Sequence, residues 1–371
     1  MKRLRTVVTL QAAGALITLL LGIIPQAQAV QDASPPYREV DVGIAVPAGP
    51  TLAGTLTLPA TSDQVPAVVL ISGSGPQDRD EAIPGVPGYR PFAVIADHLG
   101  RRGVAVLRYD DRGTAKSTGN HATATSADLA SDAEAAWRFL RARREIAWAR
   151  VGLMGHSEGG LIAAMVAARN PQVAFVVSMA GPGVPGYDLL LKQNERVLRA
   201  MGLPPEVVER GVAEARANLE LIRTEQWDRL RAVILETGGR QLAALPEQER
   251  AKLPPLERLA EEQMMFLRTW MRFFVKYDPG PDWARVHVPV LALFGVLDVQ
   301  VDLWQNRAGM VAALGRGGTG DVTVAVFPRA NHLFQEATTG SVTEYAKLPP
   351  AFVPGFLDTI SGWIRPRFRN P

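Results

Sequence analysis

The 371-residue chain contains no cysteine, so disulfides, thiol nucleophiles and thiolate metal sites are excluded. It also lacks a strong excess of either charge, because 40 Lys and Arg residues stand against 37 Asp and Glu, a formal net charge of +3. We therefore expect no general attraction to nucleic acid or to anionic lipid. A third absence is a long apolar run. The run at residues 12–24 is shorter than the about 20 residues that a membrane-spanning helix needs.

That run belongs to a predicted export signal at residues 1–29. Basic residues stand at positions 2, 3 and 5, the apolar run follows, and Ala27-Gln28-Ala29 is the small-residue pattern that a signal peptidase recognises. The alternative is an uncleaved N-terminal anchor, whereas a lipid-anchored lipoprotein would require a cysteine. Cleavage after Ala29 would bring the net charge to zero. We expect a periplasmic or secreted protein with no stable membrane insertion after cleavage.

Downstream of this segment, short apolar runs alternate with amphipathic stretches of helical period. Two alternating segments, 38–46 and 52–58, predict an antiparallel hairpin. Further strands are predicted at 65–71, 104–109, 151–154, 173–179, 290–294 and 322–327, with helices at 92–101, 127–144, 159–169, 303–314 and 352–364. Near-continuous apolar strands separated by helices are typical of a parallel sheet covered on both faces. We therefore expect an α/β fold with a mostly parallel central sheet flanked by helices.

One long stretch interrupts this alternation. Residues 186–285 are rich in Leu, Glu and Arg and follow a helical period, broken at Pro204-Pro205, Gly238-Gly239 and Pro254-Pro255. Sheet elements continue on both sides of it. We therefore interpret the stretch as a helical lid inserted after the sixth core strand, rather than as a separate domain. The predicted core then consists of residues 30–185 and 286–371.

The strongest chemical signal is Gly155-His156-Ser157-Glu158-Gly159, which directly follows an apolar strand and opens a helix. A Gly-x-Ser-x-Gly pattern at a strand-to-helix turn is typical of the nucleophile elbow of α/β-hydrolases. Small flanking residues are needed because helix and strand approach closely, and the helix N-terminus stabilises developing negative charge. The five residues also arise by chance as a glycine-rich turn. The strand and helix on either side favour Ser157 as a nucleophile.

The expected partners of Ser157 follow in the order Ser, Asp, His that this fold uses. Asp298 comes just after the strand at 290–294, and His332 lies in a loop after the strand at 322–327. A serine hydroxyl is a poor nucleophile near neutral pH, so a histidine must take its proton and a carboxylate must orient that histidine. Asp302 is the competing acid, but its position fits the N-cap of the next helix. His156 adjoins the nucleophile, so we expect its side chain to point elsewhere.

The oxyanion hole is expected to consist of two backbone amides. One belongs to Glu158, the residue after the nucleophile. The other is predicted in the loop at 72–76, with Ser74 and Gly75 as the candidates, because Pro76 has no amide hydrogen. A glycine-rich loop could also hold a phosphate, but no Gly-Lys-Ser or Gly-Lys-Thr follows it. The nucleotide-binding alternative is therefore the weaker one.

Weaker signals concern charge and the lid. The mixed signs of the charged clusters at 77–81 and 108–113 favour a network that braces the oxyanion loop over a substrate or metal site. No cluster has metal-ligand spacing, so we predict neither a metal nor a cofactor. A Met- and aromatic-rich helix in the lid is either packed core or the lining of an acyl pocket. The pocket candidates are Met265, Phe266, Trp270 and Phe274.

Together the elbow, the loop at 72–80 and the segment at 108–113 resemble bacterial esterases of the α/β-hydrolase superfamily, related to the serine aminopeptidase and acyl-thioesterase-like branches. The resemblance extends from Leu52 to the C-terminus and is vague in the lid. It implies a serine carboxylic-ester hydrolase that forms an acyl-enzyme with a small-molecule ester. One alternative is a serine peptidase or amidase of the same fold acting on short peptides, with Glu261 and Glu262 as candidates for binding a terminal amine. The other is a non-catalytic binding protein.

Overall fold

The computed structural model describes residues 35–368, and the predicted export signal lies outside them. Its eight strands form one sheet in the order β1-β2-β4-β3-β5-β6-β7-β8. β1 pairs antiparallel with β2 and β2 antiparallel with β4, whereas every later pair is parallel. The strands are β1 (Tyr37–Ala45), β2 (Thr51–Pro59), β3 (Val65–Ile71), β4 (Ala105–Tyr109), β5 (Ile146–His156), β6 (Val176–Met179), β7 (Val290–Gly295) and β8 (Val322–Phe327).

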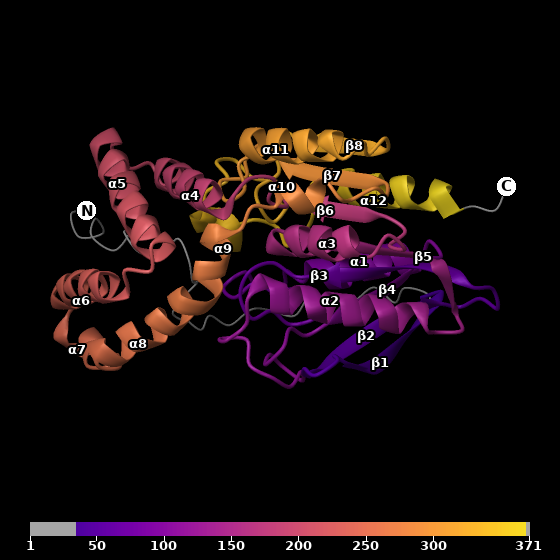
Figure 1. Cartoon of the computed structure of the whole chain (residues 1–371), viewed down its shortest axis with the longest axis horizontal. Helices are drawn as coiled ribbons and strands as arrows, with labels where there is room; N and C mark the ends of the chain where they lie inside the picture. Colours follow the sequence, from indigo (N-terminus) through magenta and orange to yellow (C-terminus); the bar gives the residue numbers. More distant parts are fainter. Residues whose placement is uncertain (1–34, 369–371) are drawn as a thin grey trace.

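Helices cover both faces of this sheet (Figure 1). α1 (Pro91–Gly100) and α12 (Phe356–Ile364) contact each other on one face, and α2 (Ser126–Arg141), α3 (Glu158–Arg169) and α11 (Leu303–Arg316) lie on the other. The central strands are buried almost throughout, and every residue of β4 and β7 is buried. Strands that are apolar on both faces are stable where helices shield both faces of the sheet from water. The predicted α/β fold with a mostly parallel sheet is therefore confirmed.

Two predicted boundaries differ from the structure for identifiable reasons. β5 begins well before the predicted strand at 151–154, because Ile146 pairs with Val65 ahead of a register shift. The last helix was expected from residue 352, but Phe352 forms an isolated bridge with Gln335 instead. Gly355 then adopts φ 82° as the N-cap, so the helix begins at Phe356.

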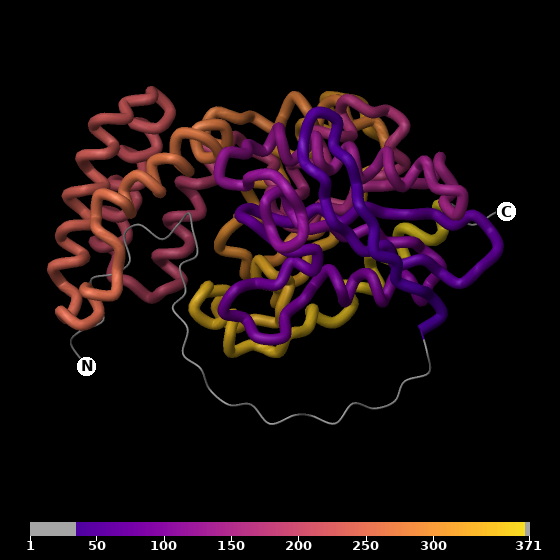
Figure 2. The backbone as a smooth tube through the Cα atoms, turned by 90° about the horizontal axis from the view of Figure 1, so that it is seen from below, coloured from indigo at the N-terminus to yellow at the C-terminus, as the bar shows by residue number. Residues whose placement is uncertain are grey.

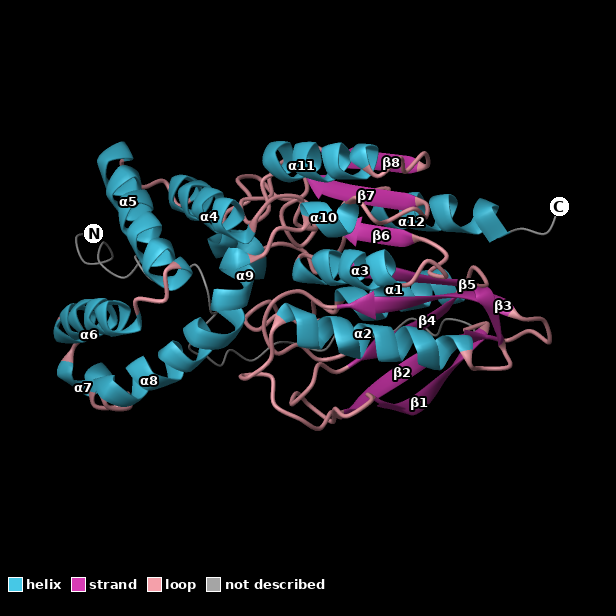
Figure 3. Cartoon of the chain, in the orientation of Figure 1, coloured by secondary structure: helices cyan, strands magenta, loops and turns pink. Residues whose placement is uncertain are grey.

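Between β6 and β7 the chain is helical, as the sequence indicated, and we call residues 186–283 the helical insertion. It projects beyond the carboxyl ends of the parallel strands, at the end of the molecule opposite α12 (Figures 2 and 3). None of the helices among residues 35–368 is long and apolar enough to span a membrane. The helical insertion comprises α4 (Gly186–Ala200), α5 (Pro205–Arg223), α6 (Trp227–Ala243), α7 (Glu247–Arg250), α8 (Leu256–Phe266), the π-helix η1 (Leu267–Met271), α9 (Arg272–Lys276) and α10 (Gly280–Trp283).

Candidate active site

Ser157 occupies the sharp turn between β5 and α3, with φ 53° and ψ −121°. Such a conformation costs a non-glycine residue on the order of 1–3 kcal/mol and persists only where the surroundings enforce it. Here they do: a Cβ on Gly155 would lie 1.9 Å from Gly159 O, and a Cβ on Gly159 would lie 2.1 Å from Ile71 O. The Ser157 amide also donates to Met179 O at 2.8 Å. The turn therefore has the strained geometry expected of a nucleophile elbow.

Asp298 and His332, distant in sequence, meet at the carboxyl ends of β7 and β8. His332 Nδ1 donates to Asp298 Oδ2 at 2.8 Å, with both side chains buried. The other carboxylate oxygen accepts the amides of Gln300 and Val301 at 2.8 and 2.9 Å. A carboxylate can only accept, so this contact favours the tautomer with the hydrogen on Nδ1 and leaves the Nε2 lone pair free. Asp302 is elsewhere engaged, capping α11 by accepting the Gln305 amide at 2.9 Å.

His332 lies beside the turn that carries Ser157. His156, the chain neighbour of Ser157, contacts His332 with ring centroids 4.8 Å apart and binds His332 O through Nε2 at 3.0 Å. Within residues 35–368 no hydrogen bond joins the Ser157 hydroxyl to His332. Contacts of this kind are often long until substrate binds. The structure thus brings Asp298 and His332 into contact next to the Ser157 turn, and proton transfer between Ser157 and His332 stays a prediction.

The loop after β3 passes close to Ser157. A Cβ on Gly73 would lie 3.3 Å from Ser157 Cβ, a tight contact that a larger residue could make only if its neighbours shifted slightly. The Gly73 amide itself is taken, because it donates to Glu81 Oε1 at 2.7 Å. In the described part of the chain, no protein acceptor takes the amides of Ser74, Gly75 or Glu158. These three predicted donors therefore remain available to a substrate oxygen, and their role stays a prediction.

Acidic side chains form hydrogen bonds with this loop and fix its position. Asp111 accepts the Ser72 hydroxyl at 2.8 Å and the Gln77 amide at 2.9 Å. Burial raises the pKa of Asp111 well above its usual range, against the lowering effect of those two hydrogen bonds. Asp110 forms a two-point pair with Arg79, whose Nη2 lies 2.7 Å from Oδ2. These contacts fit the bracing role that the mixed charges at 77–81 and 108–113 indicated.

The side chain of Glu158 connects the elbow to the helical insertion. It is buried, and its Oε1 accepts hydrogen bonds from Ser126 Oγ at 2.6 Å and Trp270 Nε1 at 2.8 Å. Burial raises the pKa of Glu158, and the hydrogen bonds partly offset that rise. Trp270 lies in the π-helix η1, a type of helix that is rare and often found at functional sites. This contact is one that the sequence did not indicate.

The four predicted pocket residues divide into two groups. Phe266, Trp270 and Phe274 stack along one face of the helix, with successive ring centroids 5.1 and 4.8 Å apart. Through Trp270 this stack reaches Glu158, next to the nucleophile. Met265 does not belong to the stack and is 43% exposed. Lining of a substrate pocket stays a prediction for all four.

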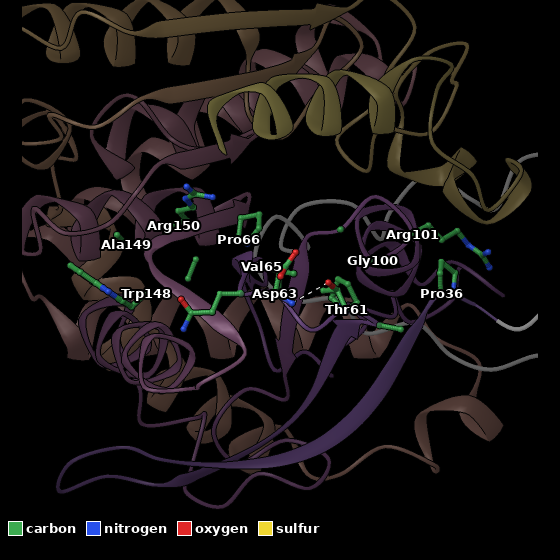
Figure 4. Close-up of a pocket in the computed structure, with 15 residues that line it drawn as sticks. Pro36, Thr61, Asp63, Val65, Pro66, Gly100, Arg101, Trp148, Ala149 and Arg150 are labelled. Atoms are coloured by element: carbon green, nitrogen blue, oxygen red, sulfur yellow. Dashed lines mark hydrogen bonds between the residues drawn. The ribbon is translucent and has the colours of Figure 1, made fainter. Parts of the chain in front are cut away.

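A hollow of about 840 Å³ lies away from these residues (Figure 4). Its lining includes Val65 and Pro66 at the start of β3, Gly103 before β4, and Trp148 near the start of β5. It therefore opens at the amino ends of the parallel strands. β3, which pairs with β5 from one end to the other, has 7 residues, so the two ends of the parallel strands are separated by roughly 20 Å. The hollow contains none of the predicted site residues and is not the candidate active site.

Comparisons with known proteins find hydrolases that are similar to this chain. Residues 89–222 match the family described as serine aminopeptidase, S33. Esterase EstD of Thermotoga maritima is 27% identical over 285 residues, which make up 76% of this chain but only 58% of the relative. The chain thus spans less than two thirds of that protein.

Solved structures share the fold at lower identity. An esterase of Pyrococcus furiosus superposes with a TM-score of 0.54 at 14% identity, covering 95% of this chain and 100% of the other. Dipeptidyl peptidase 4 of Porphyromonas gingivalis gives a TM-score of 0.52 at 14% identity, covering 89% of this chain and 35% of the other. The sheet and these solved structures show that the chain has the fold of α/β-hydrolases. In sequence it is similar to an esterase.

Proposed function

We propose that the protein is a serine carboxylic-ester hydrolase that works through an acyl-enzyme. Ser157 attacks the carbonyl carbon of a small-molecule ester while His332 Nε2 takes the hydroxyl proton and passes it to the departing alcohol. Water, deprotonated by the same imidazole, then attacks the acyl-enzyme and releases the acid. The observation that carries the proposal is the buried 2.8 Å bond between His332 and Asp298 beside the strained Ser157 turn.

The developing negative charge on the carbonyl oxygen needs donors fixed in advance. The Glu158 amide opens α3, so it combines a hydrogen bond with the positive end of the helix dipole. The second donor comes from Ser74 or Gly75 in the loop that Asp111 and Glu81 hold in place. In this proposal the oxyanion hole is prepared before substrate arrives, because its loop is anchored by buried carboxylates.

A peptidase is the second candidate, because the matched family is described as serine aminopeptidase and one structural neighbour is a dipeptidyl peptidase. An aminopeptidase needs a carboxylate that binds the terminal amine of its substrate. The two acidic residues suggested for that role are engaged elsewhere: Glu261 pairs with Arg231 at 2.8 Å and Glu262 with Arg258 at 3.0 Å, all on the surface. This favours the ester over the peptide, and a non-catalytic binding protein has no specific contact in its favour.

Kinetics on matched chromogenic substrates test the proposal. We expect p-nitrophenyl esters of short acids to be hydrolysed with a far higher kcat/KM than aminoacyl p-nitroanilides. Ser157→Ala should abolish the esterase activity, whereas Ser131→Ala on the exposed face of α2 should leave it unchanged. Faster turnover of the anilides would replace the esterase with the peptidase. Equal activity in Ser157→Ala would contradict both.

We also propose that the chain is exported and cleaved after Ala29. Support comes from the order of basic residues, apolar run and small residues at 1–29. Expression of the full chain in a Gram-negative host, followed by fractionation and intact-mass measurement, should recover a periplasmic or secreted protein that begins at Val30. A full-length species retained in the membrane fraction would favour the uncleaved anchor instead.

A further inference from the structure

His156 is buried between the two loops that build the candidate site. Its Nδ1 lies 2.8 Å from Glu81 Oε1 and its Nε2 lies 3.0 Å from His332 O. Glu81 Oε1 also accepts the Gly73 amide at 2.7 Å. One imidazole and one carboxylate therefore connect the oxyanion loop, the elbow and the loop that carries the base.

The partners of the two ring nitrogens decide the protonation state of His156. A backbone carbonyl can only accept, so Nε2 must carry a hydrogen. A carboxylate also only accepts, so Nδ1 must carry one as well. An imidazole with a hydrogen on both nitrogens is a cation. We propose that His156 is a permanently protonated positioning residue, whose two N–H groups fasten the oxyanion loop, through Glu81, to the backbone of His332.

The alternative puts the shared proton on Glu81 and leaves His156 neutral. In water a histidine binds a proton more tightly than a glutamate, since their ordinary pKa values are about 6.5 and 4.3. Asp298 strengthens that order, because it adds a second negative charge near the imidazole. Burial lowers the pKa of His156, but the charge and hydrogen bond of Glu81, with smaller effects of His332 O and Asp298, raise it overall.

Within residues 35–368, the charges that act on the His156 imidazole are the negative ones of Glu81 and Asp298. Burial raises the pKa values of Tyr89 and Asp111, the other titratable side chains whose charges interact with Glu81. Phe334 covers the edge of the imidazole, with ring centroids 6.4 Å apart. The His156 cation thus lies between the carboxylates of Glu81 and Asp298, and a charge-assisted donor holds the His332 carbonyl.

This role rests on the proposed function, because it assigns to His156 and Glu81 the positioning of the oxyanion loop and of His332 relative to Ser157. Neither side chain is required to touch the substrate. Misplacement of catalytic groups by about 1 Å can cost on the order of 100-fold in rate. Loss of the bridge should therefore lower kcat with little change in KM, because the groups that bind substrate are not removed.

The protonation state can be measured without any activity assay. The chain has five histidines, so the side-chain 15N and 1H correlations of the labelled protein can be assigned by single substitution. At pH 8.5 we expect one histidine, absent from His156→Gln, to show hydrogens on both ring nitrogens and imidazolium nitrogen shifts. The exposed His287 serves as the control for the assignment, and its signals should be unchanged in His156→Gln. A neutral His156 at pH 8.5 would overturn the proposal even if the protein proves to be an esterase.

Glu81→Gln then tests the positioning role. Glutamine keeps an acceptor for the Gly73 amide but removes the charge that holds the proton on His156. We expect kcat for p-nitrophenyl esters to fall by about 10- to 100-fold, KM to stay within about threefold, and the imidazolium signals to disappear at pH 8.5. His287→Gln should match the unsubstituted protein. An unchanged kcat despite loss of those signals, or retention of the signals without Glu81, would contradict the assignment.

Discussion

The sheet and the helical insertion are stabilised in different ways. Every residue of β4 and β7 is buried, whereas α6 buries only Leu230 and Ile234 among its 17 residues. The surface of the insertion carries ion pairs within single helices, such as Arg240 with Glu236 at 3.0 Å, both more than 60% exposed. Exposed pairs of this type contribute about 0–1 kcal/mol each. The proposed catalytic residues Ser157, Asp298 and His332 lie on the sheet, where we expect the least tolerance of change.

The sheet and the helical insertion also differ in how they relate to the candidate active site. At Gly155 and Gly159 a Cβ would lie 1.9 and 2.1 Å from backbone oxygens, so the turn on the sheet has no room for a larger residue. A buried hydrogen bond from Trp270 to Glu158 joins the insertion to this turn. We therefore expect core substitutions to affect catalysis or folding strongly, and insertion substitutions to act mainly where they touch Glu158.

The largest effect should come from the acid that orients the base. Asp298→Asn keeps an acceptor for the amides of Gln300 and Val301 but presents an amide group to His332 Nδ1, which disfavours the required tautomer. We expect kcat to fall by about 10⁴-fold with little change in thermal unfolding. Asp302→Asn is the matched control, because asparagine caps helices as well as aspartate does. A similar loss in both variants would mean that Asp298 has no special role.

Substitution of a glycine should affect stability in opposite directions in the sheet and in the helical insertion. In Gly155→Ala the new Cβ would lie 1.9 Å from Gly159 O, backbone that cannot move away cheaply. We expect a loss of at least about 3 kcal/mol in the free energy of unfolding, or no folded protein. In Gly239→Ala, inside α6, the Cβ would meet only Leu256 at 3.8 Å, and better helix propensity should stabilise by about 0.5–1 kcal/mol. Urea unfolding of both variants decides between these signs.

The contact between the two regions should have an intermediate effect. Trp270→Phe retains an aromatic ring between Phe266 and Phe274 but removes the hydrogen bond to the buried Glu158. Glu158 Oε1 keeps its hydrogen bond from Ser126, so the variant loses one hydrogen bond, worth about 0.5–1.5 kcal/mol, and we expect kcat/KM for esters to fall about 10-fold. The exposed Trp304→Phe on α11 is the control. Unchanged stability and kinetics in Trp270→Phe would show that the insertion is not coupled to the elbow through this bond.

The pH dependence of stability should distinguish the core from its surface. Burial lowers the pKa of His156, but the charge and hydrogen bond of Glu81, with smaller effects of His332 O and Asp298, together raise it on folding. A raised pKa gives a contribution that is fully present below about pH 6.5, the unfolded value, and is lost as pH rises through the folded value. Unfolding free energies should therefore decline on the alkaline side in the unsubstituted protein and decline less in Glu81→Gln. Parallel curves for the two proteins would contradict the charged state of His156.

The smallest effect is expected on the surface of the insertion. Glu236→Ala removes the partner of Arg240 from α6 without touching the core. We expect less than about 0.5 kcal/mol of change in unfolding free energy and the same kcat/KM. A loss of activity here would require a long-range coupling that no described contact provides.

The parts predictable from the sequence were those with a local physical cause. The apolar runs predicted the parallel strands, and the glycines of the elbow indicated its strained turn. The contact of Asp298 with His332 follows from their positions after neighbouring strands. By contrast, the hydrogen bonds of Glu158 with Ser126 and Trp270, and that of His156 with Glu81, join residues 32 to 112 positions apart. No periodicity marks such pairs, although Glu81 lay in a charged cluster and His156 beside the nucleophile.

The account depends most on Ser157 being a nucleophile activated by His332. Incubation of the folded protein with a fluorophosphonate, followed by intact-mass measurement and peptide mapping, tests this directly. We predict a single adduct on the peptide that contains Ser157, absent in Ser157→Ala and formed far more slowly in His332→Ala. Folded protein that stays unlabelled, or an adduct on another residue that persists in Ser157→Ala, would contradict it.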